Sequence, residues 1–306
     1  MNKILKKLSL FHYNIGFFDY NPEKLSQGEC SVAWLRHPYK DRFFADPFIL
    51  SVDDDEIKVL VEDFEYRRWK GCISLLVVDR KDYHLKRKKT LLDLDTHLSF
   101  PFILRKPEGI YVIPENSESG RLTAWKYDLN TETLSKISVL TDMAVIDPVV
   151  RKIGEHYYLY GSIKGKNENG ALYQWESMEE LSGYRLMREE PVKQGKEDAR
   201  RGGNFFMMDG QLYAATQCCT HSYGEALTIC KVNVMDNTLL EETPVVSLYP
   251  QKPYTEGLHT LNISEGLCVV DGLTYLFRPV EKIKRMLCFR GMKLRKECNL
   301  LEMSIG

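Results

Sequence analysis

The chain has 306 residues and a formal net charge of −1, from 42 basic and 43 acidic residues. That balance, without a basic stretch interleaved with aromatic residues, gives no indication of a nucleic-acid partner. No stretch approaches the ~18 apolar residues of a transmembrane helix. The eight cysteines show no CxxC pair, so we expect reduced thiols, no metal site and no cofactor in a cytoplasmic protein.

The N-terminal segment, residues 1–18, is basic and then partly apolar. Polar residues at positions 12–14 interrupt its apolar part, and no cleavage site of small residues follows, so it does not match a signal peptide. The next apolar segment, residues 30–35 (CSVAWL), is predicted to form a strand.

Five apolar units then repeat along the chain. The string PFIL occurs at residues 47–50 and 101–104, and PVV follows at 148–150. Similar steps lead to GGNFFMM at 202–208 and LHTLNI at 258–263. A period of roughly 50 residues is typical of propeller blades, so we expect five blades beginning near residues 43, 97, 145, 200 and 257.

Each unit also has the pattern of a β-hairpin. An apolar strand is followed by a polar turn, such as VDDDE at 52–56, and then by a second strand. Third strands are predicted at 72–78, 121–127, 170–176 and 226–232, and fourth strands at 90–94, 136–140 and 185–189. The sequence therefore predicts an all-β, single-domain, five-bladed propeller over residues 1–306, with four-stranded antiparallel blades around a central channel. The strand at 30–35 is expected to close the last blade.

Polar side chains gather where the hairpins should meet the channel. In a propeller, the start of each first strand and the end of each second strand lie at one edge. The candidate residues at this edge are Asp46, Glu62, His97, Glu115, Asp147, Arg200, Gln217 and His259, with Tyr223 nearby in sequence.

The polar side chains at this edge can be interpreted as structural or as functional. An Asp-Pro pair such as Asp46-Pro47 can be only a turn signal, and His97 and His259 can be structural. Carboxylates clustered at a channel, however, repel one another and resist desolvation, which a fold tolerates mainly for a ligand or a reaction. Paired carboxylates suit glycosidic chemistry, in which one protonates the leaving oxygen and another is base or nucleophile. The neighbouring polar groups could bind sugar hydroxyls or a phosphate.

The strings ADPFIL, HLSFPFIL with YVIPEN, VIDPVV with YYLYGS, and ARRGGNFF carry a family resemblance. Across about residues 43–272 the chain resembles the N-terminal propeller of plant glucosamine inositolphosphorylceramide transferase and its bacterial relatives. More distantly, it is similar to glycoside hydrolase family 43. The resemblance implies a carbohydrate or glycoconjugate ligand.

The hydrolase likeness also implies roles for individual residues. Asp46 would be the base and Asp147 the group that tunes the pKa of its neighbours. The fourth-blade position at which the hydrolases have an acidic Glu reads Arg-Gly-Gly-Asn here, so we expect Glu115 to be the acid, with Glu225 and Glu242 as substitutes. The closer family often has Arg at position 204 and Asp at position 218, where this chain has Asn204 and Cys218.

Three functions fit these features. The first is a glycosidase-like or glycosyl-transferring enzyme that uses Asp46, Glu115 and Asp147. The second is a non-catalytic glycan-binding or accessory module in the biosynthesis of a cell-surface polysaccharide or glycolipid, beside a partner glycosyltransferase or another synthesis enzyme. The third is a scaffold for protein partners, which predicts apolar patches on the rim.

Overall fold

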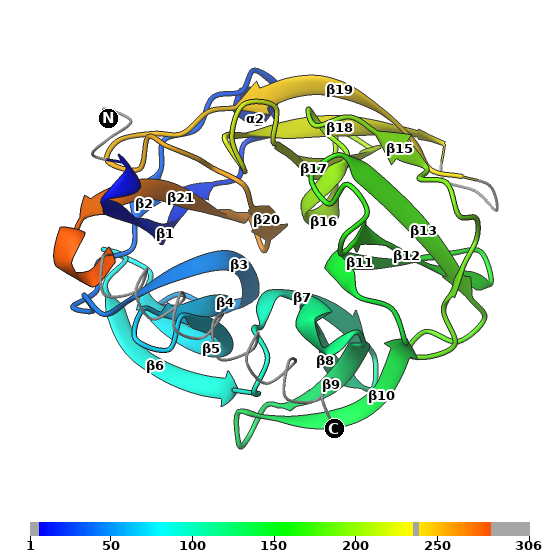
Figure 1. Ribbon diagram of the computed structural model, residues 1–306, viewed down its shortest axis with the longest axis horizontal. Coiled ribbons are helices and arrows are strands. Elements are labelled where there is room, and N and C mark those ends of the chain that lie inside the picture. Colours follow the sequence, from blue (N-terminus) through cyan, green and yellow to red (C-terminus); the bar gives the residue numbers. More distant parts are fainter. Residues whose placement is uncertain (1–5, 235–238, 283–306) are drawn as a thin grey trace, which may run out of the picture. The chain divides into compact units, whose positions relative to one another are not determined.

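The computed structural model describes residues 6–234 and 239–282, in two compact units. One unit spans residues 13–273, and the other includes, among the described residues, 6–12 and 274–282. The described residues form the five antiparallel sheets of a five-bladed β-propeller (Figure 1), which confirms the predicted fold class. Among the described residues, no helix combines the length and the apolar character needed to cross a membrane.

In the first two blades the strands follow one another in sequence from the inside outward. Blade 1 consists of β3 (Arg42–Val52), β4 (Glu56–Glu65), β5 (Lys70–Asp79) and β6 (Leu85–Leu92). Blade 2 consists of β7 (Ser99–Lys106), β8 (Gly109–Glu115), β9 (Leu122–Asp128) and β10 (Thr133–Thr141), with a short 3₁₀ helix at Ser117–Ser119.

Blades 3 and 4 follow the same order, with one addition. Blade 3 consists of β11 (Val145–Ile153), β12 (His156–Ile163), β13 (Ala171–Ser177) and β14 (Arg185–Leu186), and β15 (Lys193–Gln194) also pairs with β13. Blade 4 consists of β16 (Arg200–Met208), β17 (Gln211–Cys218), β18 (Ala226–Val234) and β19 (Glu241–Leu248).

Blade 5 combines strands from both ends of the sequence. Its order is β2 (Ala33–Trp34), β1 (Ser9–Asp19), β21 (Leu267–Phe277) and β20 (Leu261–Ser264), and a short helix, α2 (Pro22–Ser26), precedes β2. The segment predicted at 30–35 supplies the two-residue outer strand, and β1 lies between it and β21. Pairing early residues with late ones leaves no open edge between the last blade and the first.

The packing of blade against blade explains the apolar strand sequences. In the middle strand β5, the eight residues from Gly71 to Val78 are all buried, whereas most of the outer strand β6 is at least partly exposed. The innermost strands β3, β7, β11, β16 and β20 each contact the inner strands of both neighbouring blades. This ring brings the starts of the five hairpins together.

A bulge interrupts the inner strand at the same place in three blades. The strand registers shift between Ala45 and Phe48, between Ser99 and Phe102, and between Ile146 and Val149. The bulged residues, Asp46, Phe100 and Asp147, have positive φ angles of 48°, 42° and 49°, and each precedes a proline. A non-glycine residue in this region costs roughly 1–3 kcal/mol and is held by its surroundings. The bulges position Asp46 and Asp147 in the candidate site.

Candidate functional site

Carboxylates from neighbouring strands hold the three bulges. The amide of Asp46 donates to Asp271 Oδ2 over 3.1 Å, and the amide of Phe100 donates to Asp46 Oδ2 over 3.2 Å. The amide of Asp147 donates to Glu115 Oε2 over 3.2 Å. Each bond joins one blade to the next, so these carboxylates have a structural role as well as a potential chemical one.

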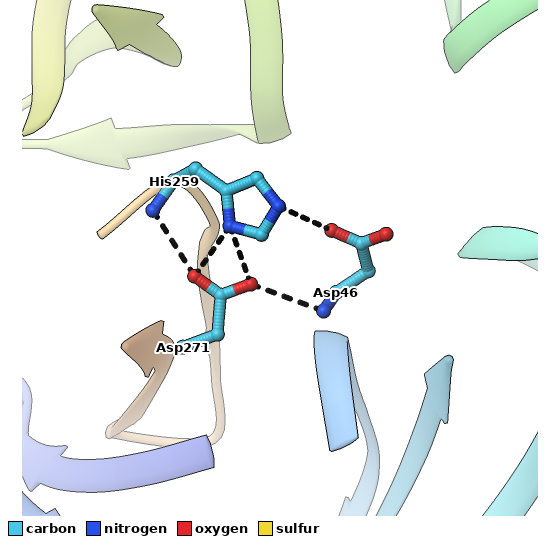
Figure 2. Close-up of side chains that lie close together, drawn as sticks. All are labelled: Asp46, His259 and Asp271. Carbon is cyan, nitrogen blue, oxygen red and sulfur yellow. Dashed lines mark hydrogen bonds and ion pairs between the residues drawn. The ribbon is translucent and has the colours of Figure 1, made fainter. Parts of the chain in front are cut away.

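The first part of the site is a buried ion pair shared by Asp46, His259 and Asp271 (Figure 2). His259 Nδ1 lies 2.7 Å from the carboxylate of Asp271, and its Nε2 lies 3.4 Å from Asp46 Oδ1. The hydroxyl of Thr260 donates to the same Asp46 oxygen over 3.0 Å. The imidazole thus bridges carboxylates from the first and the fifth blade.

The positive charge of the His259 imidazolium and the negative charges of Asp46 and Asp271 stabilise one another. Burial by itself would lower the pKa of His259, but Asp271 and Asp46 raise it to about 9. Burial raises the pKa of Asp46 to about 6, although His259 opposes the rise. Near neutral pH we therefore expect an imidazolium between two carboxylates. By distance alone the three side chains could also ligate a metal ion, but the ion would first have to displace the ring proton.

The second part of the site is centred on Asp147. Its Oδ2 accepts hydrogen bonds from Arg200 Nε over 2.7 Å and from Gln217 Nε2 over 2.8 Å. Arg200 and Gln217 lie opposite each other on β16 and β17. Arg200 Nη1 also donates to Asn169 over 2.7 Å. The buried charge of Arg200 is therefore paired with that of Asp147.

Tyr223 connects the two parts. Its ring lies 4.9 Å from the guanidinium carbon of Arg200 and 5.4 Å from the ring of His259, in an edge-on arrangement. Gly224, with a φ of +59°, follows it, and a Cβ there would lie 2.6 Å from the Cβ of His259. The absence of a side chain lets this loop pass close to His259. Tyr223 is nevertheless 41% exposed.

Two further carboxyl groups, Glu115 and Glu62, lie at the same edge. Glu115 also accepts a hydrogen bond from Ser117 over 2.9 Å. Burial and the charge of Asp147 raise the pKa of Glu115 to about 8. Glu62 lies 3.4 Å from His97 Nε2, and burial raises its pKa well above its usual value.

The nine residues chosen from the sequence therefore each contact another member of the set. Asp271 and Asn169 complete the arrangement but were outside that choice. Asp271 follows the fifth second-strand segment LCVV, the place that Glu62 and Glu115 occupy in their own units, so the repeat itself indicates Asp271 as a group at this edge. Asn169 lies between β12 and β13, in a segment whose polar composition indicates only a loop.

The two substitute acids have other partners. Glu242 is buried and accepts two hydrogen bonds from Arg201, over 2.8 and 2.6 Å. Burial would raise its pKa, but Arg201 lowers it overall. Glu225 contacts His221, whose side chain is 84% exposed. Neither group takes part in the contacts around Asp46 and Asp147.

The five-bladed propeller fold is accompanied by a match to a family model that covers most of the chain. A profile described as glucosamine inositolphosphorylceramide transferase 1, N-terminal, matches residues 30–257. The chain belongs to this family, which confirms the resemblance inferred from its sequence.

Particular relatives carry the same name. Glucosamine inositolphosphorylceramide transferase 1 of Arabidopsis thaliana is 30% identical over 209 residues, which cover 66% of this chain and 27% of the relative. The protein of that name from Oryza sativa subsp. japonica is 28% identical over 215 residues, with coverage of 68% and 28%. The chain thus spans about a quarter of the length of these relatives.

Two solved structures with a similar fold are glycosidases. An α-L-arabinofuranosidase from Podospora anserina has a TM-score of 0.55 at 12% identity, covering 72% of this chain and 76% of that one. A β-xylosidase/α-arabinofuranosidase from a compost metagenome has a TM-score of 0.52 at 12% identity, with coverage of 78% and 92%. At such low identity the likeness establishes the fold only.

Proposed function

We propose that this propeller binds a carbohydrate or glycoconjugate at the carboxyl cluster and acts on a glycosidic bond there. The observation that carries the proposal is the gathering of buried carboxyl groups from neighbouring blades at one edge of the propeller. Burial raises the pKa of Asp46 to about 6, that of Glu115 to about 8 and that of Glu62 well above its usual value, so near neutral pH the edge holds both an ionised and a protonated carboxyl group. This is the division of roles that acid–base catalysis on a glycoside requires.

The surrounding groups support a sugar as the ligand. Asp46 would accept a proton from water, while Asp147 would keep Arg200 and Gln217 in place. Gln217 Oε1 is buried and has no hydrogen-bond partner in the described part of the chain. A buried acceptor of this kind is favourable only when a donor, such as a sugar hydroxyl or a water molecule, satisfies it.

A second candidate is a non-catalytic glycan-binding module that serves a partner glycosyltransferase in glycolipid or polysaccharide synthesis. The hydrogen bonds that fix the oxygens of Glu115 and Asp147 favour it, because groups engaged in holding the fold are less free to react. The transferase names of the longer relatives support the same kind of partner. A cytoplasmic location is part of this proposal.

A screen of nitrophenyl furanosides and pyranosides tests the enzymatic proposal. We expect turnover of at least one donor by the native chain, and a loss of about 10²–10⁴-fold in kcat for Asp46→Asn, since the substituted group cannot accept a proton. Equal rates for the native chain and the variant would contradict the role of Asp46. Sugar binding by calorimetry without any turnover would favour the binding module.

A further inference from the structure

Glu62 differs from its counterparts in the other acidic blades. Glu62 pairs across the ladder with Ala45, and Glu115 pairs likewise with Ser99, each just before a bulge. Glu115 accepts the bulge amide of the next blade. In blade 1 the acceptor for the bulge amide of the next blade, that of Phe100, is Asp46 and not Glu62. Glu62 therefore does not hold a bulge in place, as Glu115 does.

The carboxyl group of Glu62 consequently has few partners. Within residues 6–234 and 239–282, its one hydrogen-bonding or ionic contact is His97 Nε2, at 3.4 Å. Asp46, Glu115, Asp147 and Asp271 each accept two or more hydrogen bonds. Yet Glu62 is only 8% exposed. A buried carboxyl with so few donors favours its protonated form.

His97 provides no positive charge to change this. The amide of Gly71 donates to His97 Nδ1 over 3.0 Å, so that nitrogen is the acceptor and the proton of the neutral ring lies on Nε2, toward Glu62. Burial lowers the pKa of His97, and Lys70 and Lys164 lower it further while Glu118 opposes them. The ring therefore offers Glu62 a weak N–H donor rather than a cation.

The neighbouring groups whose charges act most strongly on Glu62 are acidic. Four carboxyl groups act on it: Asp46 on β3, Asp63 on β4, Glu115 on β8 and Asp271 on β21. Burial is the largest cause of its raised pKa, and these neighbouring charges add to it. The acidic surroundings and the small number of hydrogen bonds thus both favour the protonated form of Glu62.

We propose that Glu62, rather than Glu115, is the proton donor of this site. The inference rests on the proposed function. The O–H bond of Glu62 breaks as its proton passes to the glycosidic oxygen, and the electrons of the breaking C–O bond go to that oxygen. Water adds to the sugar carbon and gives its proton to Asp46. Transfer of that proton back to Glu62, directly or through solvent, restores the starting state.

Glu115 then becomes a positioning residue. Its Oε2 accepts from the amide of Asp147 and its Oε1 from the hydroxyl of Ser117. Both bonds fix the carboxyl beside the bulge, while Glu62 keeps an oxygen free of such bonds. The two glutamates can be compared directly, because they occupy the same ladder position in adjacent blades.

The first test needs no substrate. The full chain is labelled with ¹³C at the glutamate carboxyl carbons, and Glu62→Gln and Glu115→Gln assign the two signals. We expect the Glu62 signal to titrate at a clearly higher pH than the signals of the exposed glutamates of the same chain, because burial raises its pKa. A Glu62 signal that titrates together with those of the exposed glutamates would overturn the inference, whatever the outcome of the donor screen. Glu62→Asp, which keeps the acid, guards against misassignment from a local rearrangement in the glutamine variant.

The second test uses a donor that the screen finds active. A proton donor matters for a poor leaving group, such as an alkyl alcohol, and little for dinitrophenolate. We expect Glu62→Gln to lower kcat by about 10²–10⁴-fold on the alkyl glycoside and by less than about tenfold on the dinitrophenyl glycoside. Glu115→Gln should slow both by the same factor. Equal losses for Glu62→Gln would overturn the donor role and leave the Asp46 result intact.

Failure of the proposed function gives a different pattern. If no donor is turned over, bond cleavage at this site is wrong and the donor role of Glu62 fails with it. The titration of the Glu62 carboxyl would still show whether the site holds a proton there. The two results therefore separate an error about Glu62 from an error about the reaction.

Discussion

Arg200 illustrates how single residues serve both the fold and the site. It is buried, and its guanidinium donates to Asp147 and Asn169. Tyr223 also lies against its face. A charge in this position is stable only because its partner is buried with it. The same pairing keeps the acceptor Asp147 oriented toward the site.

We predict that Arg200→Met destabilises the protein by about 3–5 kcal/mol, because it leaves the carboxylate of Asp147 buried without its cation. Urea unfolding followed by tryptophan fluorescence measures this change. The double variant Asp147→Asn/Arg200→Met should recover part of the loss, since it removes the unpaired charge. If the double variant were as unstable as the sum of the two single variants, the pairing would not be the cause.

At the scale of an element, the inner strand of blade 4 replaces the bulged aspartate with glycines. Gly203 has a φ of +151°, and a Cβ there would lie 2.0 Å from the carbonyl oxygen of Leu261. The close approach brings blades 4 and 5 together, where Asn262 also accepts from the amide of Asn204 over 2.8 Å. Gly203 is thus required both by its positive φ angle and by the lack of space for a Cβ beside Leu261.

We predict that Gly203→Ala costs at least about 3 kcal/mol, because backbone atoms of two blades must separate. Gly210→Ala is the matched control, since Gly210 also has a positive φ, +75°, but nothing within 4 Å of the added Cβ. The control should lose only about 1 kcal/mol from backbone strain. Thermal unfolding of both variants measures the difference, and equal losses would exclude contact as the cause.

A strand could be predicted from the sequence where its apolar residues follow a regular or repeated pattern. The inner hairpins repeat the same apolar strings, so both the blades and the acidic edge followed from the sequence. The strand β1 was not predicted, because His12, Tyr13 and Asn14 interrupt its apolar pattern, although the structure buries all three. The carboxylate-to-amide bonds between blades involve residues up to 225 positions apart. No local pattern specifies such partners, so the distinction between Glu62 and Glu115 required the structure.

For the propeller as a whole, the bonds that close the ring are also the bonds of the site. Asp271 and Thr260, from the fifth blade, hold Asp46 of the first. Asn262 donates to the carbonyl of Pro47 over 2.8 Å. Closure and site chemistry therefore share the same titratable groups, and the stability of the whole unit should depend on their protonation.

His259 and Glu115 both make the folded state less stable as the pH rises. The pKa of His259 is raised from 6.5 to about 9, so its contribution to stability is complete below about pH 6.5 and is lost as the pH rises through about 9. The pKa of Glu115 is raised from 4.5 to about 8. Its folded environment favours the protonated form, so stability falls as the pH rises from about 4.5 through 8.

We therefore predict that the free energy of unfolding falls by roughly 5 kcal/mol between about pH 6 and pH 9. Urea denaturation at several pH values measures this slope. Glu115→Gln should flatten it, because the amide cannot ionise, and His259→Gln should flatten it while lowering stability at pH 6. A stability that rises over this range would contradict the raised pKa values of both groups, because it would mean that Glu115 and His259 lose their protons in the folded state without penalty.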